Sequence, residues 1–196
     1  IWGLIDLGLL GFAAYQALPS QKENPRLRRI GYLFLGSCLA NIVWLFLWHY
    51  ELFPLTLLAM LILLGLLLGI YLNLGVGKEK VPTAERWLVH LPFSIYLGWI
   101  TVATVANVTA LLDFLKWNGW GISEQAWTVI ILAAVLIITW AVSLTRKDIA
   151  YALVIIWAVT GIAVKHAATQ VVALVAWITA ALVLLGIAYS WLRKKA

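Results

Sequence analysis

The chain has 196 residues, of which 64% are hydrophobic and only 11% are charged, and its formal net charge at pH 7 is +6. A soluble globular domain is about 45–50% apolar and about 25% charged, so this composition is that of a membrane protein. Nearly all 14 Lys and Arg residues lie in short breaks between apolar runs. This charge distribution reports membrane orientation, and it excludes the basic, aromatic-rich surface that binds nucleic acid.

Seven apolar segments follow one another, each near the roughly 20 residues that cross a bilayer as a helix. They cover residues 1–18, 30–48, 55–74, 93–112, 126–144, 149–164 and 171–192. We therefore predict an all-α, polytopic transmembrane helix bundle with seven spans in this chain. The chain opens inside an apolar segment, with no Met and no charged region before it, so we expect upstream residues and an eighth span in the intact protein.

The breaks between the segments alternate in basic residues. In chain order, including the C-terminal end, they carry four, none, three, one, two, one and three Lys or Arg, which places 12 on one side and 2 on the other. The positive-inside rule assigns the richer side to the cytoplasm, together with the C-terminus. We expect a multi-pass protein of the bacterial inner (cytoplasmic) membrane.

Three residues predict where helices begin. Ser123 precedes Glu124 and Gln125 and is suited to cap the fifth helix. Pro54 and Pro92 suit the first turns of the third and fourth helices, where a missing backbone N–H costs nothing.

Three segments each carry a tryptophan and a polar residue on one helical face. The faces are formed by Trp2 and Asp6 in the first segment, by Asn41, Trp44 and Trp48 in the second, and by Tyr96, Trp99, Ala103 and Asn107 in the fourth. Polar groups are costly at membrane depth, so these faces should contact protein or a cavity rather than lipid. Two interpretations stay open: a pocket for a flat, mostly apolar ligand, and helix–helix packing.

Few residues suggest chemistry. Asp6 is an acid inside an apolar segment, which indicates a proton or ligand site, although it lies near the segment's start and could reach the interface. The sequence has no nucleophile elbow, phosphate loop or carboxylate pair, so an enzyme is not the leading interpretation and we predict no catalytic residue. Three scattered histidines and Cys38 offer no metal-ligand spacing, so we predict no metal site.

Two motifs carry a resemblance to a known family. Residues 39–46, LANIVWLF, contain L-x-N-x-x-W, and residues 96–107, YLGWITVATVAN, contain Y-L-x-W-x-x-x-A-T-x-x-N. These resemble the third and fifth helices of the TspO/MBR family, the translocator or tryptophan-rich sensory proteins that include the peripheral benzodiazepine receptor. Trp2, with Gly8, Gly11 and Tyr15, is similar to the start of the family's second helix.

The resemblance implies a membrane bundle, often dimeric, that binds porphyrins, sterols and synthetic aromatic ligands in a pocket between helices. By position, the residues that match motif positions at or near that pocket are Trp2, Asn41, Trp44, Trp99, Ala103 and Asn107. Tyr96 and Asp6 complete our candidate ligand site. No obligatory cofactor is expected. Porphyrin or heme is the expected ligand, and the expected partners are membrane lipid and a second copy of the chain or a larger membrane complex.

The resemblance covers residues 1–112, or four of the family's five helices. We therefore predict a TspO/MBR-like bundle over residues 1–112 and a three-helix extension over residues 113–196. Asp6 departs from the family, because an aromatic residue, commonly Tyr, usually stands there. The leading function is binding of a tetrapyrrole or other hydrophobic ligand for sensing, regulation or transport. The alternatives are a structural or assembly protein and a porphyrin-degrading enzyme, an activity that the family also implies.

Overall fold

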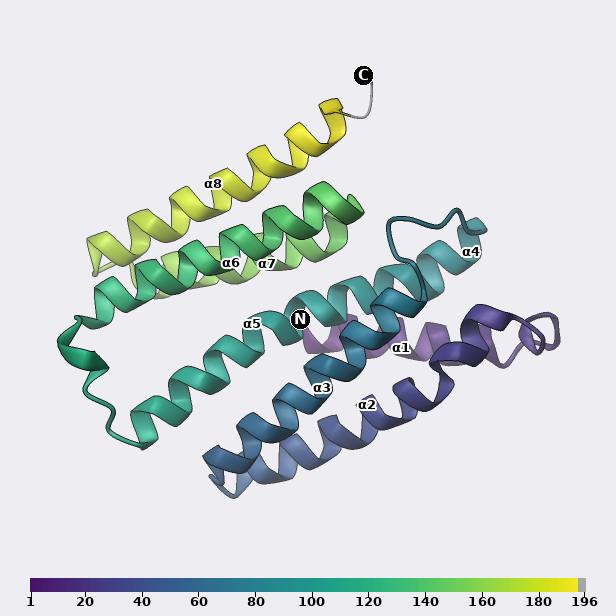
Figure 1. The fold of residues 1–196 in the computed structure, drawn as a ribbon, viewed down its shortest axis with the longest axis horizontal. Coiled ribbons are helices and arrows are strands. Elements are labelled where there is room, and N and C mark those ends of the chain that lie inside the picture. Colours follow the sequence, from purple (N-terminus) through teal and green to yellow (C-terminus); the bar gives the residue numbers. More distant parts are fainter. Residues whose placement is uncertain (194–196) are drawn as a thin grey trace. The chain divides into compact units, whose positions relative to one another are not determined.

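Helices joined by short turns make up the structure, a computed structural model that describes residues 1–193 (Figure 1). No strand occurs in that part of the chain, so the prediction of an all-α polytopic bundle is confirmed. Lys194 and Lys195, counted among the C-terminal basic residues, lie outside the described residues. The chain forms two units, unit 1 over Ile1–Phe114 and unit 2 over Leu115–Ala196.

Unit 1 contains the helices that carry the predicted site. They are α1 (Trp2–Gln16), η1 (Pro19–Gln21), α2 (Pro25–His49), α3 (Phe53–Asn73), α4 (Thr83–Glu85), the π-helical turn η2 (Arg86–His90) and α5 (Leu91–Phe114). α3 packs between α2 and α5, and α1 packs along η2 and α5 (Figure 1). Pro54 lies in the first turn of α3, as predicted.

Three phenylalanines join α1, α2 and α5 in the core of unit 1. The ring of Phe12 lies 4.9 Å from that of Phe34 and 5.0 Å from that of Phe93, and the latter two are 5.9 Å apart. All three pairs meet edge to face, the arrangement that the ring quadrupole favours. Such pairs contribute about 0.5–1.5 kcal/mol each beyond the burial of their surface. This core fixes the three helices on which the candidate site is built.

The fourth apolar segment begins earlier than predicted. α4, η2 and α5 form one continuous helix from Thr83 to Phe114, so Pro92 lies in its interior and the first-turn assignment was wrong. A proline inside a helix removes one backbone hydrogen bond and crowds the preceding turn. Here the widened π-helical turn Arg86–His90 ends two residues before Pro92. Hydropathy marked the apolar stretch, whereas the helix itself extends back over polar residues.

Seven apolar helices of the described residues correspond to the seven predicted segments, but they differ in length. Five are long and apolar enough to cross a membrane: α2, α3, the continuous helix Thr83–Phe114, α6 (Glu124–Arg146) and α8 (Gln170–Leu192). α7 (Ile149–Lys165) has 17 residues and α1 has 15. At about 1.5 Å per residue, α7 falls short of the roughly 30 Å hydrocarbon core.

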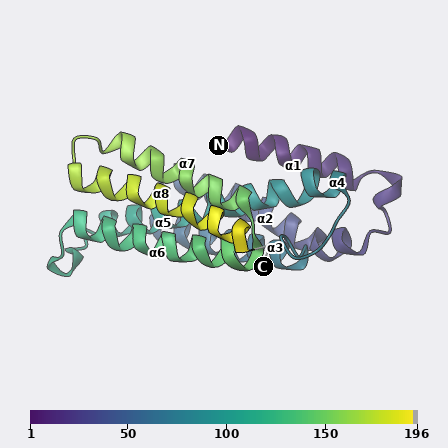
Figure 2. The same cartoon turned by 90° about the horizontal axis from the view of Figure 1, so that it is seen from above.

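In unit 2, α8 packs against both α6 and α7, and the three lie side by side in Figure 2. A short turn, η3 (Gly119–Gly121), precedes α6. The hydroxyl of Ser123 accepts the backbone N–H of Ala126 at 3.3 Å, so Ser123 caps α6 as predicted. The indole of Trp140 donates to the carbonyl of Leu182 at 3.0 Å and lies directly over Gly186. A Cβ at Gly186 would stand 2.7 Å from Trp140 Nε1, so this α6–α8 contact requires glycine.

Candidate functional site

Four of the predicted site residues meet around the first tryptophan of the chain. The ring of Trp2 stacks on Trp44 of α2 at 6.3 Å, with 27° between the ring planes. It meets the edges of two α5 side chains, Tyr96 at 6.2 Å and Trp99 at 6.3 Å. We call Trp2, Trp44, Tyr96 and Trp99 the Trp2 cluster. The three helices that carry the predicted faces, α1, α2 and α5, thus each contribute at least one ring to the same cluster.

α1 and α2 run antiparallel, and large aromatic side chains bridge them at two places. Trp2 contacts Trp44, and Phe12, ten residues further along α1, contacts Phe34, ten residues back along α2. The two contacts therefore share one register, and large rings join the helices at both places. Trp48 continues the α2 face, with its ring 5.8 Å from that of Trp44.

Two buried polar atoms lie on α2, one within the Trp2 cluster and one a helical turn from it. Asn41 Oδ1 and Trp44 Nε1 have no hydrogen-bond partner within the described residues. One is an acceptor and the other a donor, and the spacing of three residues puts them on the same face of the helix. A buried polar group without a partner costs about 1–3 kcal/mol. A ligand that offers a donor to Asn41 and an acceptor to Trp44 would recover that cost.

Asn107, at the far end of the predicted face on α5, makes a different contact. Its side-chain oxygen accepts a hydrogen bond from the Thr56 hydroxyl of α3 at 3.0 Å, in a buried position. Asn107 lies eight residues beyond Trp99, or about 12 Å along the helix. The structure therefore uses Asn107 to tie α3 to α5 rather than bringing it into the Trp2 cluster. Ala103, between the two, is half-buried.

Asp6 lies one turn from Trp2 on α1 and is exposed. Its carboxylate is near enough to Tyr96 to interact with it electrostatically. It thus stands at the edge of the Trp2 cluster, not within it.

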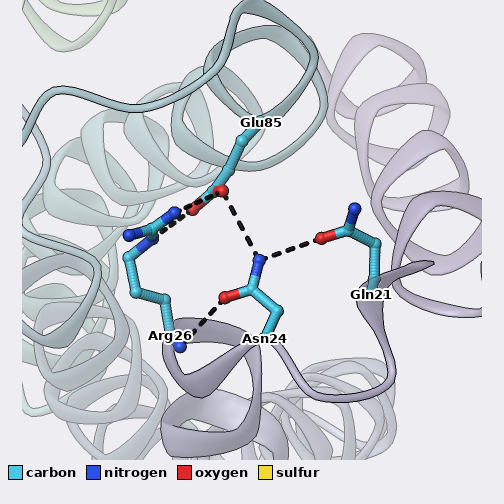
Figure 3. A network of polar contacts seen from close by, with 4 residues as sticks. All are labelled: Gln21, Asn24, Arg26 and Glu85. Carbon is cyan, nitrogen blue, oxygen red and sulfur yellow. Dashed lines mark hydrogen bonds and ion pairs between the residues drawn. The ribbon is translucent and has the colours of Figure 1, made fainter.

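A buried ion pair joins α2 to α4, away from the Trp2 cluster (Figure 3). No pattern in the sequence predicted it. Arg26 donates from Nε to Glu85 Oε1 at 2.6 Å and from Nη2 to Glu85 Oε2 at 2.8 Å. The Glu85 side chain is only 1% exposed, whereas that of Arg26 is 27% exposed. Asn24 donates to Glu85 Oε2 at 3.5 Å and to Gln21 Oε1 at 2.9 Å. The network joins the start of α2 to α4.

The ion pair could not be found by motif, because its two residues lie 59 positions apart. Asn24 and Pro25 are the one local signal, since Asn at the cap and Pro in the first turn favour a helix start. The structure confirms that start: Asn24 Oδ1 accepts the backbone N–H of Arg26 at 3.1 Å. Arg26 therefore belongs to the first turn of α2, not to a loop.

An open groove lies on another side of α1, between this helix and the continuous η2–α5 helix. None of the predicted site residues lines it. The predicted site is thus a set of rings around Trp2, and none of these rings borders the groove.

Comparison with known proteins identifies the family. A family model described as "TSPO-like protein" matches residues 1–189. No curated protein and no solved structure matches the chain. The match runs through α6, α7 and most of α8, well past residue 112, where the resemblance drawn from the motifs ends. The helices of unit 2 therefore fall within the family's pattern. With nearly its whole length matched, the chain is a member of the TSPO-like protein family.

Proposed function

We propose that the chain binds a tetrapyrrole, or another flat hydrophobic ligand, against the Trp2 cluster. The observation that carries this proposal is the buried donor and acceptor, Trp44 Nε1 and Asn41 Oδ1, beside stacked aromatic rings. A porphyrin offers a large π surface for stacking and carboxylates that can accept a hydrogen bond from the indole N–H of Trp44. Membership of the TSPO-like family supports a membrane protein of this kind. Such binding would serve sensing, regulation or transport.

Binding requires the rings of the cluster to separate, because Trp2 already contacts Trp44, Tyr96 and Trp99. Each aromatic pair contributes about 0.5–1.5 kcal/mol beyond its area. A micromolar complex has a binding free energy of about −8 kcal/mol. The cost of opening one or two of these pairs is small on that scale, and stacking on the ligand replaces what is lost.

The test is a fluorescence-quenching titration of the purified protein with protoporphyrin and with heme. Trp44→Phe keeps an aromatic ring but removes the indole donor, which should cost about 0.5–1.5 kcal/mol, or a roughly 2- to 13-fold loss of affinity. Trp177→Phe is the matched control, because Trp177 is an exposed side chain of α8. Equal losses in the two variants, or the absence of saturable binding, would contradict the proposal.

The Thr56–Asn107 hydrogen bond favours a second candidate, a structural or assembly protein whose polar faces join helices. The two candidates make opposite predictions for the titration. A structural protein shows no saturable porphyrin binding, and porphyrin quenches its fluorescence equally in the wild-type protein and in Trp44→Phe. Conversion of the porphyrin to a modified product would instead indicate an enzyme.

A further inference from the structure

An apolar groove of about 150 Å³ follows α1 on the side of the continuous η2–α5 helix. Leu4 and Leu7 of α1 form one wall, and Trp87, Leu88 and Leu91 form the other. Gly8 and Gly11 lie at the bottom of the groove. The groove belongs entirely to unit 1 and shares no lining residue with the Trp2 cluster.

The glycines allow α1 to approach the η2–α5 helix closely along the groove. A Cβ at Gly8 would stand 3.0 Å from Pro92 Cβ, and a Cβ at Gly11 would stand 3.3 Å from Leu88 Cδ2. Without side chains at these positions, the two helices approach closely along the floor. The exposed side chains of Leu4 and Leu7 then project beside it. The result is a slot with hydrocarbon on both sides.

The end of the groove at Gly11 and Leu88 carries an interfacial tryptophan and a cation. Trp87 is 62% exposed, and the neighbouring Arg86 is exposed and has no ion-pair partner among residues 1–193. The adjacent carboxylate, Glu85, is occupied by Arg26. Tryptophan favours the headgroup level of a bilayer, and an arginine there attracts anionic headgroups.

We propose that this groove holds one acyl chain of an anionic phospholipid, whose phosphate is bound by Arg86. The wall chemistry suits a hydrocarbon chain, and the free guanidinium at one end suits a negative headgroup. The site is independent of the proposed porphyrin site.

The first test measures headgroup preference by native mass spectrometry of the purified protein. The probes are dioleoyl phosphatidylglycerol and dioleoyl phosphatidylcholine, which share the same acyl chains. The wild-type protein should bind phosphatidylglycerol about fivefold more tightly, the factor expected for one basic residue at the headgroup. Arg86→Gln should abolish the preference. Lys165→Gln, which removes an exposed cation from unit 2, should retain it. Equal affinities of the wild-type protein for the two lipids would overturn the proposal.

The second test addresses the groove itself. Gly11→Leu places a side chain on the floor and should weaken the binding of both lipids, whereas Gly3→Leu, on the same helix with no neighbour within 4 Å, should not.

Because Gly11→Leu could impair folding, dibrominated phosphatidylglycerol provides an independent measurement on the wild-type protein. Bromine on the acyl chain should quench Trp87, so Trp87→Phe should lose a quenchable component. An unchanged quenched fraction in Trp87→Phe would overturn the assignment to this groove.

Discussion

The two units use their tryptophans in different ways. In unit 2, the indole of Trp127 donates to the carbonyl of Gly119 at 2.9 Å, and that of Trp140 donates to Leu182 at 3.0 Å. In unit 1, Trp44 Nε1 is buried in the Trp2 cluster without a hydrogen-bond partner in the described residues. A satisfied indole completes a helix contact, whereas a buried indole without a partner retains a donor for another molecule. This difference favours unit 1 over unit 2 as the unit that binds a ligand.

The units also differ in how their helices are joined. Unit 1 uses polar contacts between distant residues, the Arg26–Glu85 ion pair and the Thr56–Asn107 hydrogen bond. Unit 2 joins α6 to α8 through one indole: Trp140 donates to the backbone carbonyl of Leu182 and packs closely over Gly186. Substitutions should therefore weaken the two units by different physical routes.

Loss of the buried ion pair in unit 1 should have the largest effect. Glu85→Gln leaves the Arg26 guanidinium without its counter-charge, and removing one partner of a buried pair costs about 3–5 kcal/mol. We expect the low end of that range, because Arg26 remains 27% exposed. Glu23→Gln is the control, since the Arg28–Glu23 pair is exposed and such pairs contribute about 0–1 kcal/mol. Thermal unfolding in detergent, followed by circular dichroism, measures both. Equal destabilisation would show that the pair does not hold α2 to α4.

Crowding the α6–α8 contact in unit 2 should have the next largest effect. Gly186→Ala places a Cβ 2.7 Å from Trp140 Nε1, and overpacking of this kind costs about 1–3 kcal/mol. Porphyrin affinity should not change.

Gly161→Ala on α7 is the matched control, because nothing lies within 4 Å of the added methyl group. It should leave the unfolding temperature equal or slightly raised, since Ala is favoured over Gly in a helix by about 1 kcal/mol. A loss of porphyrin affinity in Gly186→Ala would contradict the proposal that only unit 1 binds the ligand.

Hydropathy predicted which segments are helical, but it did not predict the residues at which the helices begin. The apolar run of the second segment starts near residue 30, yet α2 begins at Pro25, because the Asn24 side chain caps it. The fourth segment shows the same effect, since its helix continues back to Thr83 through the π-helical turn. Hydropathy reports which residues avoid water, whereas helix ends depend on local hydrogen bonds.

The candidate site was predicted only in part. Periodicity shows which residues share a helical face, but it does not show which of them lie at the same level along the helix axis. Tyr96 and Asn107 share a face of α5, but they are eleven positions apart, or about 16 Å along the helix. They therefore contact different neighbours, Trp2 and Thr56. Pairings such as Arg26 with Glu85 depend on which helices pack together, and a single sequence does not contain that information.

Asp6 should give the smallest effect and tests how far the Trp2 cluster extends. Its carboxylate is exposed but interacts with Tyr96, so an anionic porphyrin at the cluster would meet a screened repulsion. Exposed charge pairs contribute about 0.2–1 kcal/mol, so Asp6→Asn should strengthen protoporphyrin binding by about 1.4- to 5-fold. A porphyrin dimethyl ester, which lacks the carboxylates, should bind both proteins equally. Asp113→Asn, an exposed acid near the end of α5, should change neither affinity. If Asp6→Asn strengthened the ester as much as the free acid, the effect would not be electrostatic, and the ligand's carboxylates would not lie near α1.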